Sequence, residues 1–321
     1  MQKLIILFLL LLFFAPLLVA NAGEAKNVAI LLFDGVQIID YTAPYEVFGQ
    51  AHYNVYTVAE KPSPINTSMN MTVTPKYDFS NAPQPYLLVL PGGNVDPQLQ
   101  HAAVLDWVKK SANQATYVLT VCNGAFFAGK VGLLDGLTAT TFHGLITQLQ
   151  ELAPKAKVVR NKRFVDNGKI ITSAGLTSGM DSSLYVVSKI EGMQAAKELA
   201  LHLEYNWDPE SKYARAALAD RYLEPINFNP PDDSGWKTLT NYGDLNHWEY
   251  RASTKKPSPA ELMKTVSDQV ESLKWKKKSQ AENEESWSFQ GDDGQPWNAA
   301  VRIEKGSDQT YTVTFQVNRA S

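Results

Sequence analysis

The sequence has 321 residues, of which 44% are hydrophobic and 20% are charged, and its formal net charge is −3 at pH 7. Its basic residues are scattered, so neither the net charge nor a local basic cluster favours binding to nucleic acid or to an anionic membrane surface. The chain holds a single cysteine, which excludes an internal disulfide bond and leaves one thiol whose role has to be explained.

The N-terminus has the pattern of an export signal. Lys3 provides a positive start, residues 4–19 are almost entirely apolar, and residues 20–22 (ANA) form a cleavage site. A membrane anchor is the alternative, but the apolar run is interrupted by Pro16 and is shorter than the roughly 20 residues that span a bilayer. We therefore predict that residues 1–22 are a cleaved signal peptide, and that the mature protein is periplasmic or secreted and does not stay in the membrane.

Residues 23–223 alternate apolar strands with helices. Buried strands are predicted over residues 27–33, 53–58, 86–90, 117–121, 138–142 and 170–173. Helices are predicted between them: one capped by Thr42, one over 105–112, one over 123–131, and two after Ser178. This alternation predicts parallel strands joined by crossovers, hence a flavodoxin-like, doubly wound α/β domain. Such folds place their sites at the carboxyl ends of the strands.

The rest of the chain has a different composition. Residues 224–235 (EPINFNPPDDSG) are rich in proline and turn formers and are predicted to be a linker. Residues 236–321 then predict a small α+β domain, with strands over 245–252, 287–290, 299–303 and 310–317 and a helix that begins at the capping box of Ser258 and Glu261. Five tryptophans fall in this part, and in so small a domain they are expected to form the core.

Cys122 lies between a buried strand and a helix of small residues, in the segment VLTVCNGAFFAG. This is the arrangement of a nucleophile elbow. We expect the positive end of the helix to lower the pKa of the thiol and so to make it a nucleophile. A small buried hydrophobe is the alternative for an isolated cysteine. Gly92 and Gly93 follow a neighbouring strand, and their N–H groups with that of Asn123 predict an oxyanion-type pocket.

Four segments carry a resemblance to a known family: LLFDGVQIIDYTAPYEVF, LVLPGGN, VCNGAFFAGKVGLLDGLTATTFH and ITSAGLTSGMDSSLYVV. Through them, residues 27–222 resemble the ThiJ/PfpI superfamily of class-I glutamine-amidotransferase-like proteins, above all the branch of the isonitrile hydratases and the ligand domains of AraC-like regulators. The resemblance implies an aspartate opposite the cysteine, here Asp40, where several other branches use glutamate. It also implies a small-molecule substrate and, as in many members, a homodimer.

For the hydratase branch, the resemblance implies addition of water to an isonitrile, which gives an N-substituted formamide. Cys122 would attack the terminal carbon, and Asp40, its pKa raised by the nearby thiolate, would transfer protons. Asn123 stands where this branch is expected to have threonine. His143 follows the strand over 138–142, near the place where other branches have a histidine within reach of the cysteine. It is a candidate general base, and a hydrogen-bonded pocket residue is the alternative.

Other functions remain open. A glyoxalase-like or deglycating activity on reactive carbonyls would use the same thiol. A non-catalytic protein would instead sense a ligand or an oxidant, with Cys122 oxidised to a sulfinate that Asp40 holds. The export signal and the strand-rich C-terminal part disfavour a transcription regulator, so no nucleic-acid partner is expected. The other histidines lack the spacing of metal ligands, and neither a metal nor a cofactor is predicted.

Overall fold

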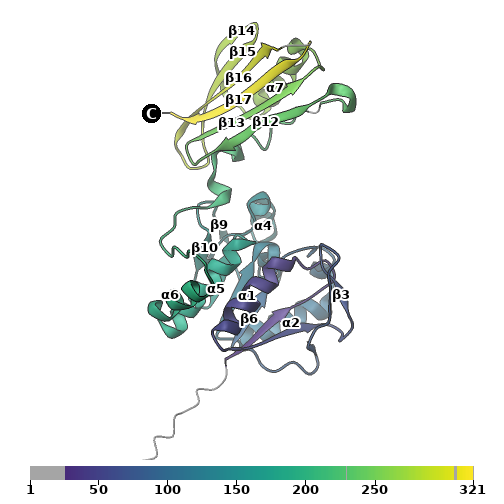
Figure 1. Cartoon of the computed structure of the whole chain (residues 1–321), viewed down its shortest axis with the longest axis vertical. Helices are drawn as coiled ribbons and strands as arrows, with labels where there is room; N and C mark the ends of the chain where they lie inside the picture. The colour runs from purple at the N-terminus through teal and green to yellow at the C-terminus, as the bar shows by residue number, and fades with distance from the viewer. Residues whose placement is uncertain (1–25, 229, 307–308, 321) are drawn as a thin grey trace, which may run out of the picture.

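The computed structural model describes residues 26–228, 230–306 and 309–320, so the predicted signal peptide lies outside the described part of the chain. Figure 1 shows an N-terminal α/β domain and a C-terminal domain at opposite ends of the molecule, joined by a single connection. Each domain has its own cluster of buried hydrophobic residues. No helix within the described ranges is long and apolar enough to cross a membrane.

The N-terminal domain is built on a seven-stranded sheet with the strand order β10-β11-β7-β6-β1-β2-β5. Its strands are β1 (Asn27–Leu31), β2 (Asn54–Ala59), β5 (Tyr77–Asp78), β6 (Leu87–Leu90), β7 (Tyr117–Val121), β10 (Phe164–Asp166) and β11 (Ile170–Ser173). Neighbouring strands are parallel except β10 and β11. The predicted flavodoxin-like parallel sheet is thus confirmed, with an antiparallel strand added at one edge. Two short ribbons lie outside it, β3 (Ile65–Asn66) with β4 (Thr72–Val73) and β8 (Thr138–Ala139) with β9 (Lys157–Val158).

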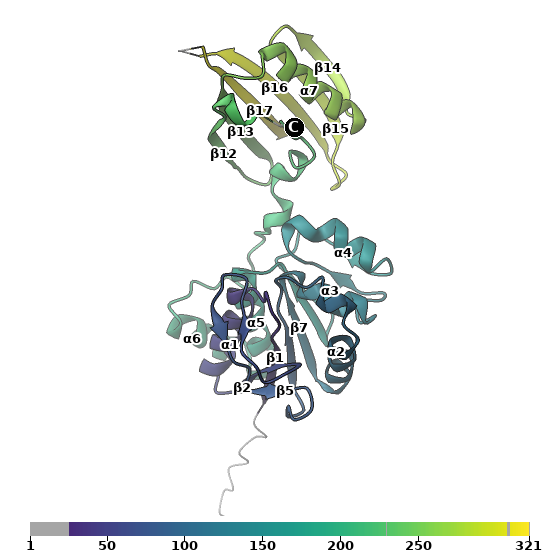
Figure 2. The same cartoon turned by 90° about the vertical axis from the view of Figure 1, so that its right-hand side faces the viewer.

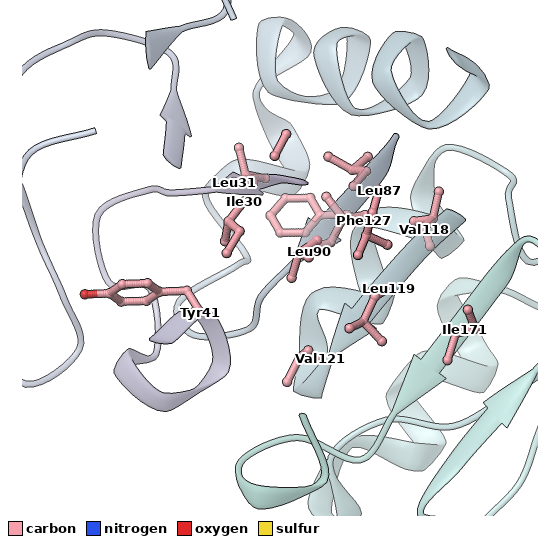
Figure 3. Packing of buried hydrophobic residues seen from close by; sticks show 14 of the residues in the cluster. Ile30, Leu31, Tyr41, Leu87, Leu90, Val118, Leu119, Val121, Phe127 and Ile171 are labelled. Atoms are coloured by element: carbon pink, nitrogen blue, oxygen red, sulfur yellow. The ribbon is translucent and has the colours of Figure 1, made fainter. Parts of the chain in front are cut away.

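Helices cover both faces of this sheet, which explains why its inner strands are apolar on both sides. Figure 2 shows α1 (Ile38–Gln50), α5 (Thr177–Glu191) and α6 (Met193–His202) on one side, and α2 (Ala102–Gln114) and α3 (Ala125–Lys130) on the other. The helix α4 (Ile146–Leu152) packs beside α3. In the core seen in Figure 3, Leu31, Leu87 and Leu90 from adjacent strands surround the ring of Phe127.

Two helices begin earlier than the sequence predicts. The helix α1 begins at Ile38, so Thr42 is not its N-cap, and the Thr42 hydroxyl donates to the carbonyl oxygen of Ile38 at 2.8 Å. The helix α5 begins at Thr177, which puts Ser178 inside its first turn. The Thr42 hydroxyl thus binds a carbonyl of its own helix, and the Ser178 hydroxyl binds the carbonyl oxygen of Gly175, two residues before α5 begins. Sequence patterns do not distinguish such local hydrogen bonds from a cap.

The C-terminal domain is a six-stranded antiparallel sheet with the order β12-β13-β17-β16-β15-β14 and one helix packed against it. The strands are β12 (Lys237–Gly243), β13 (His247–Thr254), β14 (Lys276–Ala281), β15 (Glu284–Gln290), β16 (Pro296–Lys305) and β17 (Tyr311–Arg319), and the helix is α7 (Pro259–Ser272). The predicted capping box is present, because the Ser258 hydroxyl accepts from the N–H of Glu261 while the Glu261 carboxylate accepts from the N–H of Ser258. Trp248, Trp287 and Trp297 are buried, as expected of core residues.

The boundary between the domains lies earlier than the predicted linker at 224–235. Leu218, Ala219, Tyr222 and Ile226 all belong to the buried cluster of the C-terminal domain. The Tyr222 ring lies 4.7 Å from that of Trp297, centroid to centroid. The N-terminal core therefore does not extend to residue 223. Short 3-10 turns at Arg215–Ala217, Ala219–Tyr222 and Asp232–Ser234 connect the two parts.

Candidate functional site

Cys122 lies directly after β7, at the carboxyl end of a central strand. Its φ of +59° is left-handed, a conformation that costs a non-glycine residue on the order of 1–2 kcal/mol and is common at functional sites. The turn requires glycine at position 124, because a Cβ there would collide with the carbonyl oxygen of Leu90. The side chain is only 8% exposed. The single thiol thus lies on a strained strand-to-helix turn, almost enclosed by protein.

Asp40 comes from the first turn of α1 and is fully buried. Its Oδ1 accepts a hydrogen bond of 2.8 Å from the N–H of Leu176. Its Oδ2 has no hydrogen-bond partner among the described residues, although the Cys122 thiol and the N–H of Gly92 are near enough to lower its pKa. Burial has the larger effect and raises the pKa of Asp40 to about 6. A carboxyl group of this kind can take up and release a proton near neutral pH.

The pKa of the Cys122 thiol is raised, not lowered. Burial is the largest cause and the charge of Asp40 adds to it, while the N–H of Asn123 acts in the opposite direction. The prediction that this pKa is lowered is therefore wrong, because burial disfavours the thiolate and the charge of Asp40 adds to that effect. At rest the site holds a thiol beside a carboxyl group, and the two titrate as a coupled pair.

Two glycines leave room for the reactive atoms. A Cβ on Gly92 would lie 2.9 Å from Oδ2 of Asp40 and 2.8 Å from Cβ of Cys122. A Cβ on Gly175, whose φ is +90°, would lie 2.9 Å from Sγ of Cys122. Gly92 was expected here, whereas Gly175 was not. It follows the last core strand, β11, so the rule that sites form at the carboxyl ends of strands could have found it.

Asn123 ties the cysteine turn to the neighbouring loop. Its side-chain amide donates to the carbonyl oxygen of Gly93, and its Oδ1 accepts from the N–H of Gly93, both at 2.8 Å. The N–H of Gly93 is therefore already bound and is not free to stabilise an oxyanion, contrary to the prediction. The backbone N–H of Asn123 faces the thiol and is the donor that remains beside the reacting sulfur.

His143 makes no hydrogen bond or ion pair with the described residues of this site. None of its described contacts is with Cys122 or Asp40, and its ring packs against Phe142 at 4.2 Å between centroids. Its pKa is lowered by burial and then by the charge of Arg215. The residue of this segment that reaches the turn is Thr141, whose hydroxyl donates to the carbonyl oxygen of Cys122 at 2.9 Å. The strand predicted over 138–142 ends at Ala139, and the chain then turns away.

No cluster of three or more His, Cys, Asp or Glu side chains within the described ranges is arranged to hold a metal ion. The reactive groups that the structure brings together are thus a thiol, a carboxyl group and backbone N–H groups. Such a set can form and break a bond to sulfur and can move protons at the same place.

Comparisons with known proteins match the N-terminal part of the chain to one family. The DJ-1/PfpI family matches residues 26–189. The chain is 33% identical over 186 residues to an isonitrile hydratase of Pseudomonas putida, covering 56% of this chain and 79% of that protein. It is 26% identical to protein DJ-1alpha of Drosophila melanogaster, over 58% of this chain and 87% of the relative.

Among solved structures, a ThiJ/PfpI family protein from Pseudomonas syringae aligns with a TM-score of 0.54 and 26% identity, over 59% of this chain and 78% of that one. The family match ends at residue 189, so it leaves the C-terminal domain outside. Because the match spans half of the chain and includes the thiol, the carboxyl group and both glycines, this chain belongs to the DJ-1/PfpI family.

Proposed function

We propose that the chain is an enzyme that hydrates a small electrophile, with an isonitrile as the substrate. The observation that carries this proposal is the buried Asp40, whose pKa of about 6 and unpartnered Oδ2 put a proton carrier beside Cys122. The similarity to an isonitrile hydratase supports the choice of substrate. The site also suits a slender, neutral molecule. The thiol is flanked by Gly92 and Gly175, which have no side chains to fill the space, and the charged group beside it is Asp40.

In the first step, the thiol proton passes to Asp40 as the sulfur attacks the terminal carbon of the isonitrile, and Asp40 returns that proton to the same carbon. The product is a thioimidate, in which a C–S and a C–H bond have formed. Cys122 and Asp40 together carry one proton before and after it moves from the sulfur to the carboxylate. This transfer therefore creates no additional net charge in the buried site. The raised pKa of the thiol is thus compatible with attack, because Asp40 acts as its base at neutral pH.

In the second step, ionised Asp40 takes a proton from water, which adds to the thioimidate carbon. Asp40 gives this proton to the nitrogen. The tetrahedral intermediate then breaks its C–S bond, and the proton of its hydroxyl group passes to Asp40 and from there to the leaving sulfur. This releases the N-substituted formamide and regenerates the thiol, so the overall change is the addition of one water molecule. The N–H of Asn123 is placed to stabilise the leaving sulfur.

The test is to incubate the mature chain with a simple alkyl isonitrile and to follow the formamide by NMR. Turnover is expected for wild type and for Asp106→Asn, which changes an exposed carboxylate on α2. Cys122→Ser and Asp40→Asn should each lower kcat/KM by at least about a hundredfold, as for loss of a nucleophile or a general acid–base group. Absence of formamide from the folded wild type would sink the proposal.

A non-catalytic redox sensor is the second candidate, and the buried, unpartnered Oδ2 of Asp40 is the observation that favours it. A protonated Asp40 could donate a hydrogen bond to a Cys122 sulfinate. Mass spectrometry after peroxide treatment should then show Cys122 with two added oxygen atoms and no further oxidation. The protein should also fail to convert the isonitrile. A methylglyoxal incubation that yields lactate would instead favour glyoxalase-like chemistry.

We also propose that the protein is exported, on the pattern of residues 1–22. The test is expression of the full chain with a C-terminal tag in a bacterial host, followed by N-terminal sequencing of the protein released from the periplasm. We expect a mature N-terminus near Gly23. A chain that stays in the cytoplasm with its first residues intact would contradict this.

A further inference from the structure

A cavity of about 820 Å³ lies away from Cys122, where the N-terminal domain faces the C-terminal domain. Most of its lining comes from β9, from the loop of residues 159–162 and from β10, the edge strand of the parallel sheet. Arg221 and the turn at Asp292 and Asp293 close it from the C-terminal domain. Figure 1 shows β9, β10 and α4 on the side of the N-terminal domain that faces this junction. Domain junctions are common places for small-molecule sites, and the volume is in their usual range of about 300–1,000 Å³.

The acidic groups of this groove are already paired. Asp166 binds Lys189 at 2.6 Å and Tyr185 at 2.9 Å. Asp292 pairs with Arg160 at 3.4 Å and with Arg221 at 3.1 Å. Because Asp166 and Asp292 are both paired, neither carboxylate is free to attract a cation.

Two cations of the groove are not paired. Lys157 and Lys162 line it, both residues are exposed, and neither ammonium group makes an ion pair or a hydrogen bond with any described residue. The groove therefore has uncompensated positive charge at these two positions. An anionic group that binds there gains charge-assisted hydrogen bonds and does not have to displace an existing partner.

The rest of the lining includes a set of apolar side chains. Val158, Phe164 and Val165 are half-buried, and Ile146 is buried beside them. An apolar tail laid on these residues would remove their remaining exposed surface from water, at roughly 25 cal/mol per Å². The carboxylates of Asp292 and Asp293 lie in the same groove, so a ligand with a single negative charge is favoured over a dianion such as a phosphate monoester.

We propose that this groove is a second binding site, which takes a small amphipathic carboxylate. The carboxylate lies between Lys157 and Lys162, and its hydrocarbon chain covers Val158 and Phe164. Since Arg221, Asp292 and Asp293 form one wall, the bound ligand also contacts the C-terminal domain and reduces the freedom of the two domains to move apart. The site is independent of Cys122 and does not rest on the proposed hydration.

The experiment is calorimetric titration of the full mature chain with octanoate at low ionic strength. Octanol and octylammonium serve as comparison ligands, because they differ from octanoate in the head group alone. We expect saturable 1:1 binding of octanoate, weaker binding at high salt, and no binding of octylammonium. The double variant Lys157→Met/Lys162→Met should bind octanoate at least about tenfold more weakly, as for loss of charged hydrogen bonds.

The matched control is Lys109→Met/Lys110→Met, which removes two exposed lysines from α2, outside the groove. It should bind octanoate as wild type does. All four lysines are exposed, so thermal unfolding should show folded variants. Cys122→Ser should also leave the affinity unchanged. The proposal is overturned if octanoate fails to bind, if octanol binds equally well, if the groove variant binds like wild type, or if Cys122→Ser removes binding.

Discussion

At the scale of single residues, the central feature is one proton shared by two buried groups. Asp40 and Cys122 each lose more by ionising in this site than in water, so burial alone would leave both neutral. Asp40 still ionises first, because the ordinary pKa of a carboxyl group is far below that of a thiol and the hydrogen bond from the N–H of Leu176 to Oδ1 stabilises the carboxylate. Asp40 is thus ionised at neutral pH while the thiol keeps its proton, and the carboxylate is ready to act as the base.

The raised pKa of Asp40 predicts how stability depends on pH. The native state holds this proton up to about pH 6, whereas the unfolded chain loses it near pH 3.8. The contribution of Asp40 to stability is therefore complete below about pH 4 and is lost as the pH rises through about 6. Asparagine cannot ionise and can still accept from Leu176. Asp40→Asn should gain up to about 3 kcal/mol in the free energy of unfolding, relative to wild type, between pH 4 and pH 8.

Urea unfolding of both proteins at several pH values measures this difference. Asp106→Asn is the control, because it makes the same substitution at an exposed position of α2. If the Asp40→Asn difference were the same at pH 4 and pH 8, Asp40 would not have a raised pKa in the native state.

Gly175 gives a test of the space around the thiol. Alanine at this position would suffer both a positive φ of +90° and a Cβ that lies 2.9 Å from Sγ of Cys122. Gly168 is a matched control, since its φ is +82° but nothing lies within 4 Å of the position of its Cβ. Both substitutions should cost about 1 kcal/mol or more in stability from backbone strain.

Gly175→Ala alone should also change the thiol. We expect iodoacetamide to modify Cys122 at least about tenfold more slowly in this variant, because the added methyl group closes the approach to Sγ. Rates are followed by mass spectrometry of the folded proteins at pH 8. Equal rates in the two variants would show that Gly175 does not border the path to the sulfur.

The sequence allowed prediction of part of this site. Cys122 could be placed because it directly follows a buried strand, Gly92 because it lies two residues after another, and Asp40 because of the resemblance to a known family. The bond between the Asn123 side chain and Gly93 depends on the distance between two loops, which the sequence does not encode in any local pattern. The pKa of the thiol depends on how much protein covers it. The position of the thiol at a helix N-terminus therefore predicted the wrong direction for the pKa shift.

At the scale of elements, the start of α5 is held by a cluster of charged and polar side chains. Arg163 of the loop before β10 donates through Nε to the buried Asp181, and through Nη2 to the hydroxyl of Thr177 at 2.9 Å. The Tyr205 hydroxyl also donates to Asp181, at 2.9 Å. Thr177 follows Leu176, whose N–H holds Asp40. Arg163 is therefore a positioning residue for the carboxyl group.

Arg163→Lys tests this role without leaving Asp181 unpaired, because lysine can bind one partner but has no fork to reach a second. With Thr177 released, the N–H of Leu176 should hold Asp40 less firmly and the pKa of Asp40 should rise by up to about one unit. The pH dependence of Cys122 alkylation should show an inflection near pH 6 in wild type and a higher one in the variant. Lys162→Arg, an exposed neighbour, should match wild type. A shift in stability with no shift of the inflection would mean that Arg163 has a structural role only.

Elements with an apolar pattern could be predicted, and polar edge strands could not. The core strands β1, β6, β7 and β11 and the capped helix α7 all match their predicted positions within a few residues. The strands β12 (KTLTNYG) and β14 (KKKSQA) were missed. They form the two edges of the C-terminal sheet and are mostly exposed, so they need neither alternation nor apolar side chains. Their pairing with neighbours, not their own sequence, makes them strands.

At the scale of the whole molecule, the boundary between the two domains lies where one cluster of buried residues ends and the other begins. The proline-rich segment 224–235 has the composition of a flexible linker, but residues before it already pack in the core of the C-terminal domain. Arg215 lies over the ring of Trp248 at 5.6 Å, and the N–H of Ala219 donates to the carbonyl oxygen of Asp244 at 2.9 Å. Composition and packing thus give different boundaries, and packing determines which fragments can fold.

This boundary makes a prediction about fragments. Residues 214–321 should unfold cooperatively, whereas residues 236–321 should not, because the shorter fragment lacks Leu218, Tyr222 and Ile226. Each of these buried side chains contributes roughly 1.5–3 kcal/mol, so the three together are comparable to the lower part of the roughly 5–15 kcal/mol of net stability that a domain has. Thermal unfolding followed by circular dichroism would distinguish the fragments. Residues 26–213 serve as the complementary test, since that fragment should keep a cooperative transition and the same rate of Cys122 alkylation as the full chain. A stable, cooperative fragment of residues 236–321 would instead place the boundary at the proline-rich segment, as its composition suggests.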